Sequence, residues 1–213
     1  MSNESREETS HAHEITLSDD PFTKNFLKNY GINTTIWFFP GLIMHEAAHA
    51  LAGILSGGRL TAATWWSKHG GFVSLTNVSW ATGALVSLAP LLLAPTAILL
   101  FQQGFSSLNT TAKEGILLPV LFLWLAVSLA IFSIPSVPDL KNCIHRSRKA
   151  RQFTTRTPTI LFSPLIKTLV FYIPMIISEI TAVGLLLTFR WSSTMRFAWM
   201  AVLCLATLNY FPT

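Results

Sequence analysis

Apolar segments long enough to cross a lipid bilayer recur along this chain from residue 32 onward, and they constrain its fold more than any other feature. A helix needs about 20 apolar residues to span a hydrocarbon core of about 30 Å. Two segments, Ala81–Phe101 and Gly115–Pro135, contain no charged residue. Three more, residues 32–55, 165–189 and 195–211, contain few ionisable residues. The sequence therefore predicts an all-α polytopic membrane protein with about five transmembrane helices.

Acidic residues are scarce outside the N-terminal stretch. Only 12% of the chain is charged, against about 25% in soluble domains. Six of the ten acids lie in residues 1–30, a polar stretch without a long apolar run, which we expect to be a mostly disordered tail and not a signal peptide. The other four are Glu46, Glu114, Asp139 and Glu179. Carboxylate chemistry within the membrane must use one of these four.

Basic residues are concentrated between two apolar segments. The net charge is +5, and residues 141–158 carry many of the bases. By the positive-inside rule this distribution predicts a cytoplasmic loop, which can also bind anionic lipid, and it does not predict a nucleic-acid-binding surface. Counting alternating spans back from this loop places the end of the first span, near Leu55, on the cytoplasmic side.

The segment between the first two spans, residues 57–80, has the composition of β structure. It is rich in Thr, Val, Trp and Phe and is interrupted by Lys-His-Gly-Gly. This pattern predicts a β-hairpin with Gly70 and Gly71 near its turn. The alternative is an irregular interfacial loop anchored at headgroup level by its tryptophans.

The first span contains the pattern His-Glu-Ala-Ala-His at residues 45–49. Residues four apart lie on one face of a helix, so His45 and His49 can reach one metal ion, and Glu46 lies beside them as a candidate general base. Placing an acid in the middle of a span costs about 2.5–3.5 kcal/mol of insertion free energy. A sequence without a function for this cluster would seldom carry it. The alternative is a pair of core histidines satisfied by neighbouring helices, with Glu46 hydrogen-bonded.

A catalytic zinc site needs a third protein ligand, and depth in the membrane favours Asp139. Asp139 follows the third span on the same side as His49, whereas Glu114 lies at the opposite face. Pro135 and Pro138 break the helix there, which lets the chain turn Asp139 back toward the histidines. Glu179, inside the fourth span, is either the third ligand, a partner hydrogen-bonded to a ligand, or a hydrogen-bonding group between helices.

Four features in this order resemble the site-2 protease family of intramembrane zinc metalloproteases: the His-Glu-Ala-Ala-His helix, the β-rich segment, the second span and the motif Pro-Ser-Val-Pro-Asp-Leu at residues 135–140. The resemblance implies a three-helix catalytic core within residues 31–140. It implies zinc as the cofactor, with His45, His49 and Asp139 as ligands and Glu46 as general base and acid. Leu140 stands where the family motif has glycine, and no PDZ-like insertion is present.

The resemblance further implies hydrolysis of peptide bonds in a transmembrane protein substrate, in the cytoplasmic half of the membrane. The apolar segments within residues 159–213 predict further transmembrane helices, and Gly70, Gly71 and Phe72 are candidates for positioning the substrate strand. One alternative is a membrane zinc protease of the prenyl-processing type that uses Glu179 as a ligand. Another is a protein without activity, either a protease-like scaffold or a metal-handling protein.

Overall fold

The computed structural model describes residues 34–67, 70–110, 115–156, 169, 172–189 and 194–210. This part of the chain is mostly helical, with one small two-stranded sheet. The predicted tail and Glu114 lie outside the described residues. In chain order the elements are α2 (Thr34–Trp37), α3 (Phe39–Leu55), β1 (Arg59–Thr64), β2 (Phe72–Thr76), α4 (Trp80–Leu88), the 3-10 helix η2 (Ala89–Leu92), α5 (Leu93–Thr110), α6 (Leu117–Phe132), α7 (Val137–Arg156), α9 (Ile173–Phe189) and α10 (Thr194–Tyr210).

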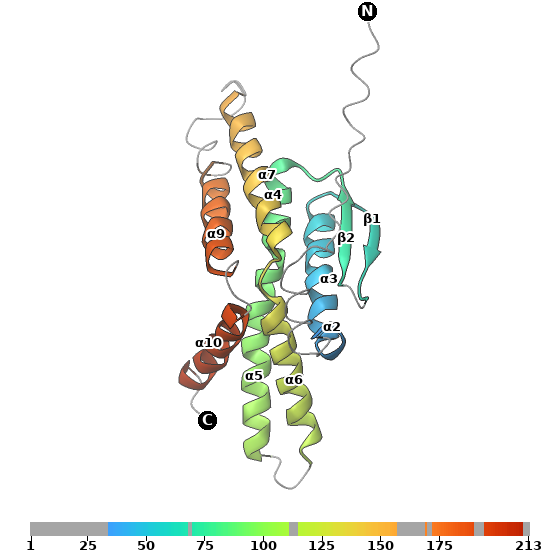
Figure 1. The fold of residues 1–213 in the computed structure, drawn as a ribbon, viewed down its shortest axis with the longest axis vertical. Coiled ribbons are helices and arrows are strands. Elements are labelled where there is room, and N and C mark those ends of the chain that lie inside the picture. Colours follow the sequence, from blue (N-terminus) through green and yellow to red (C-terminus); the bar gives the residue numbers. More distant parts are fainter. Residues whose placement is uncertain are drawn as a thin grey trace, which may run out of the picture.

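Two long helical units form the axis of the molecule. The first runs from α4 through η2 into α5, and the second runs from α6 into α7 across a bend of 47°. Figure 1 shows α3 and the sheet on one side of this axis and α9 and α10 on the other. The bend between α6 and α7 lies at Ser133–Ser136, where Pro135 interrupts the helix.

Within the described residues, fewer helices than the sequence predicts are individually long and apolar enough to cross a bilayer. Among the described residues, the helix over Trp80–Leu108 is long and apolar enough to cross a bilayer, and the bent pair of α6 and α7 is a second candidate if it counts as one span. The helices α9 and α10 supply shorter apolar stretches. A total of five transmembrane helices therefore stays a prediction.

The predicted hairpin is confirmed. Strands β1 and β2 pair antiparallel, from Arg59 opposite Thr76 to Thr64 opposite Phe72, with an irregularity between Leu60 and Ala62. Both strands contact α3, so the sheet lies along the helix that carries the His-Glu-Ala-Ala-His pattern.

The basic segment that the sequence predicts as a cytoplasmic loop, residues 141–158, is helical where it is described, because its residues up to Arg156 belong to α7. Its first turn is capped by Ser136, and its arginines and lysines are good helix formers. Arg148 and Arg151 also pair with Glu179 on α9, which fixes the middle of α7 against a neighbouring helix. The cluster of positive charge marks this segment in the sequence, but it does not predict that the segment is helical. Its cytoplasmic location stays a prediction.

Buried apolar residues form two clusters along the axis. One joins α5, α6 and α10, and the other joins α4, α7 and α9. Helix α3 crosses α6 closely at Gly41, where a Cβ atom would lie 2.2 Å from the carbonyl oxygen of Ser128, so only glycine allows this approach. The buried hydroxyl of Ser128 accepts a hydrogen bond from Gly41 N at 2.7 Å and donates one to Phe38 O at 2.9 Å. This crossing sets His45, one turn further along α3, against the end of α6.

Candidate metal centre

The two histidines of α3 are buried and each is fixed by a backbone carbonyl. His45 Nδ1 lies 2.7 Å from Phe132 O, and His49 Nδ1 lies 2.8 Å from Val86 O. A carbonyl oxygen only accepts, so Nδ1 of each ring carries the hydrogen. In the neutral imidazole Nε2 is then the free lone pair, which is the arrangement that a metal-ligating histidine requires.

The two accepting carbonyls are available because the helices that carry them are interrupted. Phe132 is the last residue of α6, so no backbone N–H of that helix follows to bond its oxygen. Val86 lies four residues before Pro90, which has no N–H to complete an α-helical bond, and its oxygen receives the Ala89 N–H of a tighter turn. Both breaks leave an oxygen that can accept from an imidazole.

Asp139 is oriented by the start of α7. Its Oδ2 accepts hydrogen bonds from Ser136 N at 2.9 Å and from Ser136 Oγ at 2.6 Å, and its own N–H donates to Ser136 Oγ at 3.3 Å. This is the reciprocal pattern of a capping box, with aspartate at the third position of the helix. The cap turns the carboxylate back across the bend and toward α3.

The structure brings together the three residues that the sequence predicts as ligands. Asp139 Oδ2 lies 3.5 Å from His45 Nε2 and 3.3 Å from His49 Nε2, and the three candidate ligand atoms all lie within 4.8 Å of one another. Four ligands placed tetrahedrally at about 2.0–2.1 Å from zinc are separated by about 3.3–3.4 Å. The two distances from Asp139 therefore match the spacing of donor atoms around one ion.

A second observation indicates that the residues fit a metal. His49 Nε2 is buried and has no hydrogen-bond partner, although Asp139 Oδ2 is 3.3 Å away. A buried polar nitrogen without a partner costs free energy, and a bound cation would satisfy it. Two imidazoles and a carboxylate are the donor set of known zinc sites, and such a set leaves the fourth position open for water.

Glu46 lies beside this cluster and is almost fully buried, at 2% exposure. It follows His45 directly on α3, and its side chain lies against Gly71, the residue before β2. A Cβ atom at Gly71 would lie 2.6 Å from Glu46 Cγ and 3.0 Å from Thr64 O, so glycine is needed where the sheet passes the glutamate. Gly71 therefore lies at the site. Gly70 has a φ of 123°, and Phe72 opens β2 opposite Thr64.

Glu179 does not join the cluster. Its carboxylate receives Arg148 Nε at 2.7 Å and forms a second ion pair with Arg151 Nη2. Both arginines lie on α7, so Glu179 holds α7 and α9 together. Among the described residues, the group of His45, His49 and Asp139 is the one with metal-ligand geometry.

Sequence reasoning missed the residues that orient the ligands. Ser136 was visible as part of a Ser-x-x-Asp pattern before α7, which is a capping signal. Pro90 was visible four residues after Val86, which marks a carbonyl without its helical donor. No signal in the sequence could pair those carbonyls with particular histidines, because that pairing depends on how the helices cross.

Comparison of the chain with protein-family models, with curated protein sequences and with solved structures finds no match.

Replacing Ser136 with alanine is expected to weaken metal binding about 10- to 100-fold, since groups that orient a metal ligand typically contribute that much. The variant removes the hydroxyl that bonds Asp139 Oδ2 at 2.6 Å but leaves all three ligands in place. Zinc affinity, measured by competition with a chromophoric chelator, tests this. Ser136→Thr keeps a hydroxyl and should restore most of the affinity. Equal affinity of wild type and Ser136→Ala would remove the orienting role of Ser136.

Proposed function

We propose that this protein is an intramembrane zinc metalloprotease that hydrolyses peptide bonds of membrane-embedded substrates. The observation that carries the proposal is the convergence of His45 Nε2, His49 Nε2 and Asp139 Oδ2 within 4.8 Å, beside a buried Glu46. The resemblance of the sequence motifs to site-2 proteases supports the same assignment. Together they support a hydrolytic metal site built on α3 and the start of α7.

A membrane location is supported by the apolar helix over Trp80–Leu108 and by large apolar side chains on the outer surface of the helices. Leu55, Leu92 and Leu117 are each more than 70% exposed, which is unfavourable in water and natural in lipid. By the positive-inside rule, the end of the molecule that carries α7 faces the cytoplasm. The candidate site lies at the α6–α7 bend, with Asp139 on the α7 side and the backbone carbonyl of Phe132, which holds His45, on the α6 side.

The chain's residues divide the chemical work between them. His45, His49 and Asp139 would hold the zinc ion, which supplies a Lewis acid that polarises a carbonyl and lowers the pKa of water toward about 7. Glu46 takes the proton of the attacking water and passes it to the leaving amine. Burial of the glutamate strengthens its electrostatic interaction with the reacting groups.

The sheet contributes to the site through Gly71. Because β2 begins directly after Gly71, an extended substrate strand laid along this edge would pass Glu46. A transmembrane helix has its peptide groups in internal hydrogen bonds, so a substrate has to unwind locally before it can be cut. We propose that the segment from Gly70 to Phe72 positions the unwound strand.

Removal of the metal tests the proposed function directly. The full chain in detergent micelles is incubated with a reporter transmembrane peptide, and the products are read by mass spectrometry. We expect cleavage that a zinc chelator abolishes and that added zinc restores. Cleavage that continues unchanged after the metal has been removed would contradict the proposal.

Gly71→Ala is expected to lower cleavage about 100-fold with little change in zinc content. A methyl group at this position would force Glu46 or the strand to move, and a displacement of about 1 Å at a catalytic group can cost this much. Gly184→Ala on α9 is the matched control, because a Cβ atom there meets nothing within 4 Å. If both variants cleave the reporter at the wild-type rate, Gly71 does not position Glu46.

A further inference from the structure

Helix α7 carries positive charge on two faces, and only one of them is neutralised within the described part of the chain. On the face toward α9, Arg148 and Arg151 both pair with Glu179. Serines 147 and 178 also meet in the same helix contact, with their hydroxyls 2.8 Å apart. This face of α7 is therefore occupied by the protein's own contacts.

Three further basic residues of α7 gather around one tryptophan. Lys149 Nζ lies 4.4 Å from the centroid of the Trp80 ring, and Arg146 Cζ lies 5.9 Å from it. The imidazole of His145 meets the same ring edge-on, at 6.1 Å between centroids. We call Trp80, His145, Arg146 and Lys149 the cationic patch. Cations above an aromatic face are held in place without losing their charge.

No carboxylate of the described residues forms an ion pair with the cationic patch. The acids described are Glu46 and Asp139 at the metal centre and Glu179 at the α7–α9 contact. Arg146 donates its Nε–H to Asn142 Oδ1 at 3.1 Å, which orients the guanidinium and leaves its charge in place. The patch thus presents ordered positive groups that no described acid neutralises.

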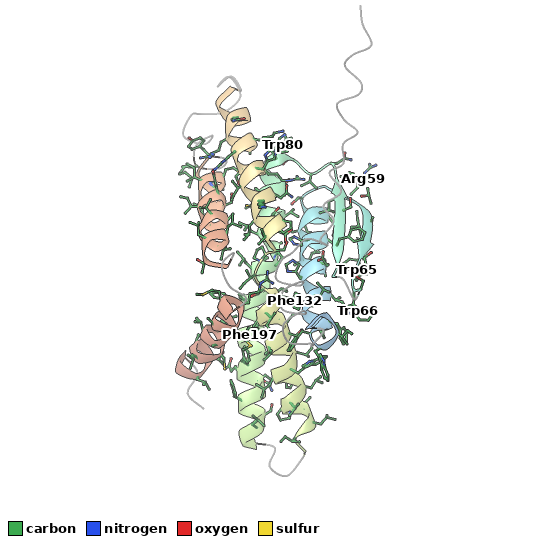
Figure 2. The ribbon with its side chains drawn as sticks, in the orientation of Figure 1. Arg59, Trp65, Trp66, Trp80, Phe132 and Phe197 are labelled. Carbon is green, nitrogen blue, oxygen red and sulfur yellow. The ribbon has the colours of Figure 1, made fainter. Side chains whose placement is uncertain are left out.

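The position of the patch indicates what binds it. Trp80 is the first residue of the apolar helix that is long enough to span a bilayer, and its side chain is half exposed. Tryptophan is enriched at the level of lipid headgroups, with apolar surface below it and charge above it. Leu85, further along the same helix, is also half exposed and lies where acyl chains would begin. Figure 2 places Trp80 and Arg59 at the same end of the molecule.

We propose that the cationic patch binds the headgroup phosphate of an anionic phospholipid in the leaflet on the α7 side. The lysine and arginine supply charge-assisted hydrogen bonds to phosphate oxygens, and the indole of Trp80 lies at the glycerol level. This proposal rests on the membrane location given above and is independent of the metal and of proteolysis. It assigns a lipid contact to α7, the helix that carries Asp139 in its first turn.

Native mass spectrometry of the full chain tests this proposal. The protein is equilibrated in detergent with equal amounts of phosphatidylglycerol and phosphatidylcholine, and the lipids retained per chain are counted. We expect the wild type to retain phosphatidylglycerol preferentially and Lys149→Gln to lower this preference about fivefold, the effect of one basic residue near a headgroup. Arg148→Gln is the matched control, because it removes one charge from the same helix on the face that Glu179 neutralises.

The possible results separate clearly. Loss in Lys149→Gln with retention in Arg148→Gln supports the cationic patch. Equal loss in both variants would mean a general charge effect, and no loss in Lys149→Gln would mean that the patch binds no lipid; either result overturns the proposal. Displacement of the lipid by millimolar inorganic phosphate would also overturn it, because the ligand would then be free phosphate. The thermal unfolding temperature of each variant shows whether the variant is folded. Counting the retained lipids requires neither metal nor substrate, so the result does not depend on the proposed protease activity.

Discussion

Glu46→Gln is expected to lower the rate of cleavage of a reporter transmembrane peptide by at least about 100-fold while the protein keeps its zinc. Glutamine has the shape of glutamate and so fits in the buried position beside Gly71, but it cannot take up the proton of the attacking water. General acid–base catalysis typically contributes 10²- to 10⁴-fold, and we expect a loss in that range. The rate of product formation and the zinc content of the same preparation are the two measurements.

Glu179→Gln is the matched control for that experiment. It makes the same chemical change at Glu179, the described acid that lies away from the metal centre, and it should leave cleavage within a few fold of wild type. Equal cleavage by wild type and Glu46→Gln would remove Glu46 from the mechanism. Zinc bound by a wild type that cleaves nothing would instead favour the non-enzymatic alternative, a metal-handling protein or an inactive scaffold.

Asp139→Ala is expected to weaken zinc binding by more than about 100-fold. Removing a ligand should cost more than removing a group that only orients one, for which 10- to 100-fold is typical. The variant also loses the two hydrogen bonds that Asp139 Oδ2 accepts from Ser136, whereas Ser136 Oγ can still accept the backbone N–H of residue 139 and cap α7. Zinc per chain, determined after dialysis against a weak chelator, measures the effect.

The separate variant Glu179→Ala distinguishes the two candidate third ligands. It leaves Arg148 and Arg151 without their shared partner, so we expect a lower unfolding temperature and an unchanged zinc content. If Glu179→Ala lost zinc and Asp139→Ala retained it, the third ligand would be Glu179 and not Asp139. That result would favour a membrane zinc protease of the prenyl-processing type.

The helices were predictable where their composition was uniform. The apolar segments over Ala81–Phe101 and Gly115–Pro135 correspond to α4–α5 and α6, and the β-rich composition correctly indicated the hairpin. The basic segment was not predictable in the same way. Its charge indicated a side of the membrane, whereas its helix depends on the Ser136 cap and on a long-range pairing with Glu179.

The three candidate ligands could be predicted from the sequence, but the backbone groups that orient them could not. The spacing of His45 and His49 fixes them on one face of a helix, and scarcity of acids left Asp139 as the best-placed partner. The carbonyls that orient the two rings come from α4 and α6, more than 30 residues away in sequence. Such contacts depend on helix crossings, which one sequence does not specify.

X-ray absorption at the zinc edge of the zinc-loaded full chain tests the central claim most directly, because it identifies the atoms bound to the metal. The proposed centre predicts two imidazole nitrogens and oxygen donors at about 2.0–2.1 Å, with no sulfur. His45→Ala should remove part of the imidazole signal or all of the metal. A sulfur ligand from Cys143 or Cys204, or an unchanged spectrum in His45→Ala, would contradict a zinc site made of His45, His49 and Asp139.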